Sequence, residues 1–526
     1  MQYFFIVILL TLLSTQTYAQ YYQNLTIANS RALALGNAVT ADPPGLDSVH
    51  YNPAGLYRAV EGKSRVELHL VYGPTPTFEF DTQWTGEYPD TNLPNFGCDT
   101  QCLLENPEPL ETQTYKVSEF NSYTPYSGKS SASSLLPRGG AGTHVDAWDA
   151  VVGSATYVAL RSGYALEQGA PGSFPRRESS TVDIVLAAPG FAKKVTNNLT
   201  LGFSIPLHYY GTEIVTSLRI PNLYLSLVSD VIESLCQDPF SVEACADDGS
   251  SLPTYDQLLE VQFEAEDKIT PSINLGFLWE PLPWLTVGGV YQSEVRHELK
   301  GDFEITYDDS LQKIIETGLL NILPNSPNEL SANGTDVGEV TISQVLPEHF
   351  SLGVSLKVTP KLKMNIDYKK TQFSEWQDFV LEFDRPTYLS AITGLVSGGP
   401  ENSSSTPRGF ANGSNWALGF EYQLRDALKL RFGYEYRPNT IPKENRTFAF
   451  PLGSTKILAT GVGYNLPGRF DVDFVYAKID SKQNIPVGSS YVTEWNPTEI
   501  YAAYPGYNLE NRISIQMAIL AVGYNW

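Results

Sequence analysis

The chain of 526 residues has few of the side chains that carry redox or metal chemistry, with four cysteines, three methionines and six histidines. The cysteines show neither Cys-x-x-Cys spacing nor matched histidines, which a zinc site would need. The histidines are scattered, and His297-Glu298 lacks the second histidine of a zinc-protease helix. The sequence therefore predicts no catalytic residue, no metal site and no cofactor, which argues against an enzyme.

Positive charge is also scarce, because 35 Lys and Arg residues stand against 58 Asp and Glu residues and leave a net charge of -23. Nucleic acid is bound through clustered Lys and Arg, so this balance argues against it as a partner. A phosphate-binding loop is missing as well, since Tyr123 stands where the first glycine of a motif ending in Gly128-Lys129-Ser130 belongs. The excess of acid predicts acidic, solvated loops.

Long apolar runs are missing after the first 19 residues. The run from Tyr3 to Leu13 is shorter than the roughly 20 residues that a helix needs to cross a bilayer. Thr17-Tyr18-Ala19 follows it and places small residues where a signal peptidase cuts. Residues 1–19 are therefore predicted to be a cleaved secretory signal, with a mature start near Gln20. A helical membrane protein is excluded, which leaves a soluble protein or a β-barrel.

Export affects how the cysteines are interpreted. They form two close pairs in segments rich in Pro, Asp and Asn, and an oxidising compartment favours pairing. We expect two small loop disulfides, Cys98–Cys102 and Cys236–Cys245. The alternative is four free thiols.

Strict alternation of side-chain character recurs along the chain, which also contains 31 Tyr and 24 Phe. An apolar or aromatic residue alternates with a polar, charged or glycine residue in Leu362–Lys369, Trp416–Leu424 and Leu428–Arg437. A period of two marks β-strands whose two faces meet different surroundings. Alternation alone does not separate a soluble sandwich from a barrel that faces lipid.

Connection lengths make that distinction. Short turns join strands in pairs, at Thr196–Asn198, Glu280–Pro283, Thr359–Lys361, Arg425–Ala427 and Leu466–Arg469. Long connections follow these pairs, roughly at Gly211–Asp267, Asp308–Leu346, Arg385–Gly413, Arg437–Ser454 and Asp480–Glu510. Outer-membrane barrels have this arrangement, with the turns in the periplasm and the loops outside. We therefore predict an all-β, antiparallel transmembrane barrel of about 14 strands over residues 64–526, with long extracellular loops at 211–267 and 308–346.

The last predicted strand is Arg512–Trp526. Its final outward-facing residues are Leu520, Val522, Tyr524 and Trp526, whereas apolar residues occupy the opposite phase upstream, at Ile513, Ile515, Met517 and Ile519. This change of phase predicts a bulge near Ile519 and Leu520. The alternative is that part of the strand lies beyond the lipid. The terminal Trp526 resembles the signal through which outer-membrane proteins meet the barrel-assembly machinery.

A barrel of this size would leak unless it were plugged. Residues 20–63 precede the first alternating strand, Arg65–Tyr72, and are rich in turn-forming glycine and proline, at Gly36, Pro43, Pro44, Gly45, Pro53 and Gly55. We predict that this segment is an N-terminal hatch inside the lumen.

Several segments carry a resemblance to a known family. The predicted hatch contains Tyr51-Asn52-Pro53-Ala54-Gly55-Leu56, and three stretches follow downstream, at Leu346–Val354 with Thr359–Leu362, at Phe373–Trp376, and at Leu430–Pro438 with Ile441-Pro442. Together they resemble the FadL-type outer-membrane transporters, the OMPP1/FadL/TodX family, over most of the chain. The resemblance implies that Asn52, Pro53, Ala54 and Gly55 are a hatch motif. In that motif Asn52 bonds neighbouring backbone, Pro53 fixes φ, and Ala54 allows close approach to the wall.

The resemblance also implies a function. We expect passive uptake of long-chain fatty acids or other hydrophobic compounds through an extracellular groove, a hatch-gated pocket and a lateral opening in the wall. The expected surroundings are the lipid and lipopolysaccharide of a Gram-negative outer membrane, and the expected state is a monomer. The alternative is a general porin or a surface adhesin.

Two loop segments are candidates for the groove, because apolar residues recur in them at helical spacing. These residues are Leu223, Leu227, Val231 and Leu235 in the first long loop, and Leu311, Ile314, Ile315, Leu319 and Ile322 in the second. The alternative is that each short helix only packs against its own loop or its neighbour.

A fatty carboxylate would also favour a cation in the lumen. The candidates are Lys363, Lys429, Arg431 and Arg437, with Lys429 and Arg431 foremost. The alternative is a ladder of paired charges, completed by Glu421, Glu435, Asp471 and Asp473.

Overall fold

The computed structural model describes residues 27–72, 77–85, 113–117, 121–124, 128–131, 136–166, 177–218, 257–316, 334–376, 378–391, 402–451, 453–466, 469–493, 504 and 506–526. The predicted signal peptide and all four cysteines lie outside these ranges, so the cleavage site and both disulfides stay predictions. Within these ranges no helix has the length and apolar character needed to cross a membrane.

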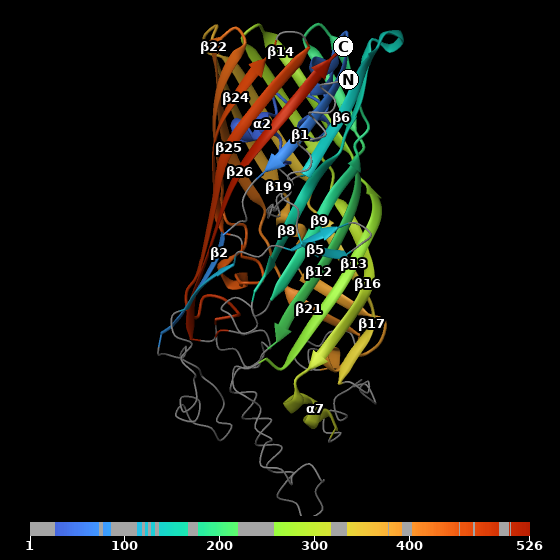
Figure 1. The fold of residues 1–526 in the computed structure, drawn as a ribbon, viewed down its shortest axis with the longest axis vertical. Helices are drawn as coiled ribbons and strands as arrows, with labels where there is room; N and C mark the ends of the chain where they lie inside the picture. Colours follow the sequence, from blue (N-terminus) through green and yellow to red (C-terminus); the bar gives the residue numbers. More distant parts are fainter. Residues whose placement is uncertain are drawn as a thin grey trace, which may run out of the picture.

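Fourteen antiparallel strands form a closed barrel (Figure 1). In their order around the wall they are β1 (Ser64–Tyr72), β6 (Leu136–Val145), β7 (Ala150–Ala155), β10 (Gly190–Thr196), β11 (Leu199–Ser204), β14 (Asn274–Leu282), β15 (Leu285–Gln292), β18 (His349–Lys357), β19 (Leu362–Thr371), β22 (Gly413–Arg425), β23 (Leu428–Arg437), β24 (Ser454–Asn465), β25 (Phe470–Ile485) and β26 (Tyr507–Asn525). The ring closes because β1 pairs with both β6 and β26. The predicted fold class is confirmed.

The apolar residues of the alternating strands face outward. On β22, Trp416 and Leu418 are 61% and 36% exposed, whereas Ala417 and Glu421 between and beyond them are buried. A soluble sandwich would bury the apolar face instead. The outer surface of the wall therefore suits lipid.

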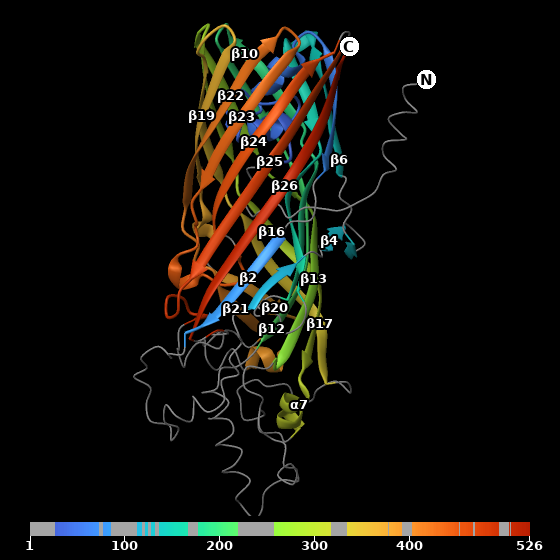
Figure 2. The same ribbon diagram turned by 60° about the vertical axis from the view of Figure 1, so that its left-hand side comes forward.

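The short turns gather at the end of the barrel that also holds the C-terminus (Figure 2). A 3-10 turn, Asp146–Trp148, joins β6 to β7 at this end. The predicted turns at 196–198, 359–361 and 425–427 join β10 to β11, β18 to β19, and β22 to β23. This end is the periplasmic end by the rule that short turns lie inside.

A second, eight-stranded sheet extends one side of the wall toward the extracellular end (Figure 1). Its strands, from edge to edge, are β21 (Ser403–Pro407), β20 (Asp378–Phe383), β17 (Thr335–Leu346), β16 (Val295–Tyr307), β13 (Leu259–Pro271), β12 (Leu207–Leu218), β9 (Glu178–Ala187) and β8 (Tyr157–Ala165). Most of them continue a barrel strand after a break of one or two residues, such as Ile205-Pro206 between β11 and β12. We call this the extracellular sheet.

The two long loops are shorter than predicted, because strands of the extracellular sheet occupy part of each. The connection predicted at 211–267 begins inside β12 and ends inside β13, which pair from Leu218↔Leu259 onward. The connection predicted at 308–346 includes all of β17. Loop lengths were overestimated because strands that leave the lipid lose the lipid-facing pattern on which the prediction depended.

Several further elements outside the closed barrel and the extracellular sheet are short. They are β2 (Thr77–Trp84), β3 (Gln113–Val117), β4 (Asn121–Thr124), β5 (Gly128–Ser131), α7 (Asp309–Glu316) and the 3-10 turns at Phe373–Glu375 and Lys443–Asn445. β2 pairs with the extracellular half of β26 and with β3.

The bulge predicted in the last strand is wrong. β26 pairs with β25 without a register shift from Phe470↔Tyr524 to Ile485↔Leu509. The two phases differ because the strand is longer than the lipid is thick: Leu520 and Trp526 face outward, whereas Arg512 and Gln516 take the same outward face further along. The upstream apolar residues point into the barrel.

Residues 27–60 lie inside the periplasmic half of the barrel (Figures 1 and 2). They contain three short helices, α2 (Ser30–Ala34), α3 (Ser48–Tyr51) and α4 (Gly55–Val60). Asn29 caps α2, because its side chain accepts a hydrogen bond from the Ala32 N–H. We call residues 27–60 the inner segment.

Candidate functional site

The predicted motif is buried where the inner segment meets the wall. Asn52 is fully buried, and its side-chain nitrogen donates to the Thr40 carbonyl at 2.8 Å and to the Phe277 carbonyl of β14 at 3.0 Å. Its side-chain oxygen accepts from the Ala54 N–H at 3.2 Å. The side-chain amide of Asn52 therefore joins two parts of the inner segment to each other and to the barrel wall.

Glycines of the wall allow this close approach. A Cβ on Gly202 would lie 2.5 Å from the Ala54 nitrogen, and one on Gly433 would lie 1.8 Å from the Gly36 nitrogen. Five wall glycines on five strands meet the backbone of the inner segment in this way: Gly202, Gly288, Gly353, Gly419 and Gly433. We call them the glycine belt. It lets backbone lie against backbone without side chains between them.

Charged residues of the wall hold the inner segment as well. Asp367 of β19 accepts from both the N–H and the hydroxyl of Thr40, each at 2.8 Å. Asp47 lies 2.7 Å from Arg138 of β6 and accepts from Asn29 at 2.7 Å. Because these groups are buried, removing one partner leaves the other without water to replace it.

The two foremost candidates for binding a carboxylate lie in a network of paired charges. Arg431 is buried and donates to Glu421 at 2.7 Å and to Asp473. Lys429 is less buried and lies 4.0 Å from Glu421. The other two cations are paired too, Lys363 with Asp42 at 2.9 Å and Arg437 with Glu435 at 2.9 Å. The arrangement is the ladder that the sequence left open as the alternative.

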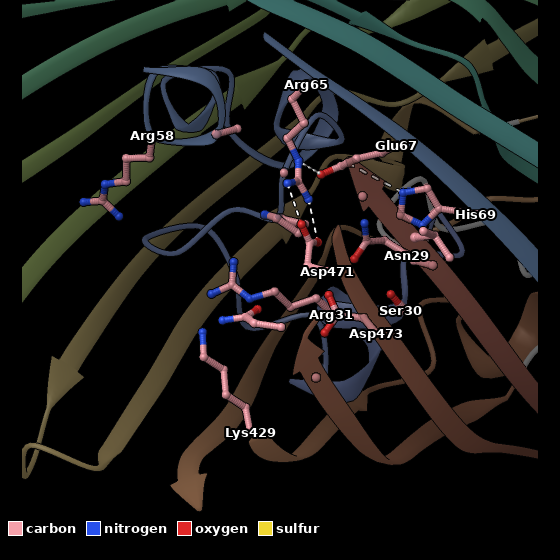
Figure 3. Close-up of a pocket in the computed structure, with 18 of the residues that line it drawn as sticks. Asn29, Ser30, Arg31, Arg58, Arg65, Glu67, His69, Lys429, Asp471 and Asp473 are labelled. Atoms are coloured by element: carbon pink, nitrogen blue, oxygen red, sulfur yellow. Dashed lines mark hydrogen bonds and ion pairs between the residues drawn. The ribbon is translucent and has the colours of Figure 1, made fainter. Parts of the chain in front are cut away.

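A polar cavity of about 280 Å³ lies beside the inner segment at the periplasmic end (Figure 3). Arg31 and Arg58 of the inner segment, Arg65 and Glu67 of β1 and Asp471 of β25 line it. Arg65 bridges the other two wall residues, at 2.5 Å from Glu67 and 2.7 Å from Asp471. This cavity suits water and ions rather than a hydrocarbon.

Beyond the inner segment the inner face of β24, β25 and β26 is apolar. Ile513, Ile515, Met517 and Ile519 of β26 are at most 2% exposed and belong to one apolar cluster with inward-facing residues of β24 and β25. Leu33 of α2 belongs to the same cluster. The inner segment therefore forms one end of an apolar interior.

The extracellular sheet has an apolar inner face too. Its cluster includes Phe263 of β13, Phe303 of β16 and Val340 of β17. Tyr307 joins the cluster at 1% exposure and donates to Asp336 at 2.6 Å. Burial raises the pKa of the Tyr307 phenol, so this group stays a neutral donor.

Two of the predicted groove residues are described with their surroundings, and both are buried. Leu311 and Ile315 of α7 are 6% and 5% exposed and pack in the cluster of the extracellular sheet. Ile314 lies on α7, but its side-chain placement is outside the described part, as are Leu223, Leu227, Val231, Leu235, Leu319 and Ile322 entirely. The described pair shows the packing that was the alternative to an exposed groove.

The wall divides between β6 and β8. β7 pairs with β6 up to Gly140↔Ala155, and the Thr156 N–H donates to the Gly139 carbonyl at 2.9 Å. Beyond Thr156 the chain enters β8, whose only ladder in the described residues is with β9. β6 and β8 therefore diverge at this level, beside the inner segment, whose His50 ring contacts Tyr157 of β8.

Comparison with known proteins identifies the family. The family pattern described as outer membrane protein transport protein (OMPP1/FadL/TodX) matches residues 9–525. The chain belongs to the OMPP1/FadL/TodX family. It is an outer-membrane transport protein.

Individual relatives of this FadL-family chain are distant. A 47 kDa outer membrane protein of Pasteurella multocida is 22% identical over 211 residues, which are 40% of this chain and 44% of that protein. The match thus spans less than half of that curated relative. Among solved structures, a Pseudomonas aeruginosa FadL homologue aligns with a TM-score of 0.64 and 15% identity over 95% of this chain and 98% of that one.

Two toluene transporters share the fold of the FadL-family chain. TbuX of Ralstonia pickettii aligns with a TM-score of 0.57 and 14% identity over 96% of this chain and 99% of its own. TodX of P. putida aligns with a TM-score of 0.58 and 14% identity over 95% of this chain and 99% of its own.

Three features of the FadL-family chain were not predicted from its sequence. The glycine belt was present as inward-facing glycines in alternating strands, but it was not recognised as the partner of the predicted hatch. The apolar interior was present as the change of phase in β26. A buried group of Asp183, His208 and His297 joins residues too far apart in sequence for any spacing rule to find.

Proposed function

We propose that this FadL-family barrel carries long-chain fatty acids or other hydrophobic compounds passively into the cell. The observation that supports this most is the apolar interior beyond the inner segment, lined by Ile515 and Met517 on one side and by the extracellular sheet on the other. Water-filled pores have polar interiors, so this lining favours hydrophobic cargo over a general porin.

The driving force is the transfer of apolar surface out of water. Each CH₂ group buried contributes about 0.8 kcal/mol, so an acyl chain of a dozen or more carbons binds an apolar wall without a specific polar contact. No nucleotide or other energy source is needed. The same physics accommodates hydrocarbons, which is why the cargo is proposed as a class.

In this proposal the inner segment is the hatch. Straight passage to the periplasm is unfavourable for apolar cargo, because the way is filled by ion pairs such as Arg31–Asp42, at 2.5 Å, and by the polar cavity beside them. Apolar cargo taking this way would separate the paired charges from one another and from water, at a cost of several kcal/mol. The hatch therefore turns hydrophobic cargo aside.

The divergence of β6 and β8 is the proposed lateral exit. It opens at Thr156, where β7 ends and β8 leaves the edge of β6 to pair with β9. Cargo leaving there enters the lipid and never crosses water. The Asp47–Arg138 pair links the hatch to β6 beside this point, at 2.7 Å, so movement of the hatch and the width of the exit are proposed to be coupled.

Capture is proposed at the extracellular loops, with Leu311 and Ile315 delivering cargo to the interior because they join its apolar lining. Lys429, the less buried of the two foremost cations, is proposed to meet a carboxylate. Trp526, which is 51% exposed at the chain end, is proposed to meet the assembly machinery. A monomer surrounded by lipid and lipopolysaccharide completes the proposal.

Uptake by purified barrels in proteoliposomes tests the function. We expect a fluorescent long-chain fatty acid to enter much faster than into protein-free vesicles, while a small sugar enters at the protein-free rate. Toluene added in excess should slow the fatty acid if the apolar interior is shared. Rapid, indiscriminate sugar entry would instead support a general porin, and no entry of either would support an adhesin.

A further inference from the structure

Four neighbouring strands of the extracellular sheet bring two histidines and two aspartates together. Asp183 lies on β9, His208 on β12, Asp267 on β13 and His297 on β16. Asp183, His208 and His297 are at most 3% exposed, and each offers a ligand atom within 4.8 Å of those of the other two. The group lies at the base of the sheet, next to the break where barrel strands become sheet strands.

His208 is oriented from both sides of its ring. Its Nδ1 lies 2.9 Å and 3.1 Å from the two oxygens of Asp183, and its Nε2 lies 3.0 Å from the hydroxyl of Ser272. Two ligands of one tetrahedral zinc ion stand roughly 3.3 Å apart, given metal–ligand bonds of about 2.0–2.1 Å. Asp183 and His208 are therefore already spaced as a ligand pair, with Ser272 able to accept the remaining ring proton.

His297 has one nitrogen committed and one without a partner. Its Nδ1 lies 2.8 Å from Asp267, so the carboxylate holds the proton on Nδ1 and leaves a lone pair on Nε2. Nε2 is buried and has no hydrogen-bond partner among the described residues. A carboxylate behind one nitrogen and a lone pair on the other is the arrangement of a histidine that binds a metal.

We propose that Asp183, His208 and His297 bind a divalent transition-metal ion of the zinc type. Two imidazoles and one carboxylate are the ligand set that such ions prefer over Ca²⁺ or Mg²⁺, which take oxygen ligands. Asp267 and Ser272 are positioning residues that orient the two rings. Three protein ligands leave one position for water.

The ion would join strands that the sheet itself does not hold together at this level. The β13–β16 ladder stops at Glu266↔Lys300, and the next pairing between these two chain segments starts at Asn274↔Gln292 in the barrel. His297 lies in the stretch between, where it faces strands β9 and β12 across β13. A metal bond from His297 to Asp183 and His208 therefore fastens β16 to β9 and β12 at the base of the extracellular sheet, where the β13–β16 ladder has ended.

Metal binding by the full chain in detergent tests this proposal. The protein carries no histidine tag, is treated with EDTA, dialysed and titrated with Co²⁺, whose visible absorption reports tetrahedral nitrogen and oxygen ligands. We expect saturation at one Co²⁺ per chain, displacement by Zn²⁺ but not by excess Ca²⁺ or Mg²⁺, and a higher unfolding temperature with Zn²⁺ than with EDTA.

Variants identify the ligands. His297→Asn and Asp183→Asn should abolish the absorption, and Asp267→Asn should weaken binding about 10- to 100-fold, as expected when an orienting carboxylate is lost. His144→Asn, at the periplasmic end of β6, is the matched control and should bind as the wild type does.

A wild-type chain that develops no tetrahedral Co²⁺ absorption and no zinc-dependent stabilisation overturns the proposal and leaves a buried hydrogen-bonded cluster. Binding that survives His297→Asn also overturns it, because the metal then lies elsewhere. Should the ligand variants fail to fold, the wild-type spectrum and stoichiometry decide alone.

Discussion

Gly433 of β23 faces Gly36 of the inner segment so closely that a Cβ on Gly433 would lie 1.8 Å from the Gly36 nitrogen. Gly36 itself has a φ of +60°, and a Cβ there would lie 2.5 Å from the nitrogen of Tyr434. Neither backbone leaves room for a side chain. At this contact the backbone of the wall packs directly against the backbone of the inner segment.

Gly433→Ala should therefore loosen the inner segment without preventing barrel assembly. The added methyl group meets backbone that cannot rotate away, and overpacking of this kind costs about 1–3 kcal/mol. Limited proteolysis of membrane-inserted protein should cut the inner segment faster than in the wild type. Gly153→Ala is the matched control, since its nearest neighbour would be at 3.3 Å. Equal cleavage of the two variants and the wild type would contradict the glycine-belt role.

Pro53→Gly should alter uptake while leaving insertion intact. Pro53 follows Asn52 in the turn against Gly202, and a glycine there frees φ and lets the turn leave the wall. We expect a change of fatty-acid uptake by several-fold in proteoliposomes, with normal heat-resistant folding on gels. Pro283→Gly, in a periplasmic turn, serves as the control. Uptake identical to the wild type would remove the hatch from the mechanism.

Met517→Glu should weaken fatty-acid uptake strongly. The side chain lies at 1% exposure in the apolar interior, where an unpaired carboxylate costs several kcal/mol and attracts water. Met517→Leu, which conserves volume, should keep most of the uptake. The measurement is the initial rate of uptake at equal amounts of folded barrel. If both variants transport equally well, cargo does not touch this wall.

Thr156→Trp should slow delivery of cargo to the membrane. Thr156 is exposed at the point where β6 and β8 diverge, and an indole there fills the proposed lateral exit. We expect uptake to fall several-fold with binding of fatty acid to the protein unchanged. Thr196→Trp, at an exposed periplasmic turn, tests for a general effect of a bulky residue. Slowed binding together with slowed uptake would point to misfolding or to a different route.

Arg431→Ala and Lys429→Ala should differ sharply. Arg431 is buried and donates to Glu421 and Asp473, so its loss removes a donor from two carboxylates. Lys363 remains 3.5 Å from Glu421, so we expect a destabilisation of about 1–3 kcal/mol. Lys429 is 4.0 Å from Glu421, so its loss should leave stability nearly unchanged. Chemical unfolding from detergent measures the first effect. Comparing uptake of a fatty acid with uptake of its methyl ester shows whether Lys429 meets the carboxylate.

Much of the architecture was readable from the sequence because strands report their surroundings locally. Trp416 and Leu418 alternate with Ala417 and Glu421, and each residue's face follows from a period of two. The alternation therefore identified the segments that cross lipid. The lengths of the connections showed which end of each segment lies in the periplasm. The bulge predicted near Leu520 was wrong because the rule that apolar residues face outward holds only within the lipid. Beyond the lipid the apolar residues of β26 point inward, so the apolar face changes without any slip in register.

Part of the candidate site was likewise predictable from the sequence, and part was not. Position in the chain and local turn chemistry were enough to single out Asn52 and Pro53, whereas the partners of Asn52, the carbonyls of Thr40 and Phe277, lie 12 and 225 residues away. Whether Lys429 and Arg431 were free cations or paired ones depended on which strands became neighbours, since β23 pairs Arg431 with Glu421 of β22.

The sequence by itself determined that this protein crosses the outer membrane on strands, with short turns at one end and long connections at the other, because alternation and chain length are local properties. Only the tertiary structure decided which glycines receive the inner segment, which charges neutralise one another and how Asp183 meets His297. These contacts depend on which strands become neighbours in the barrel and in the extracellular sheet, and spacing along the chain does not determine that pairing.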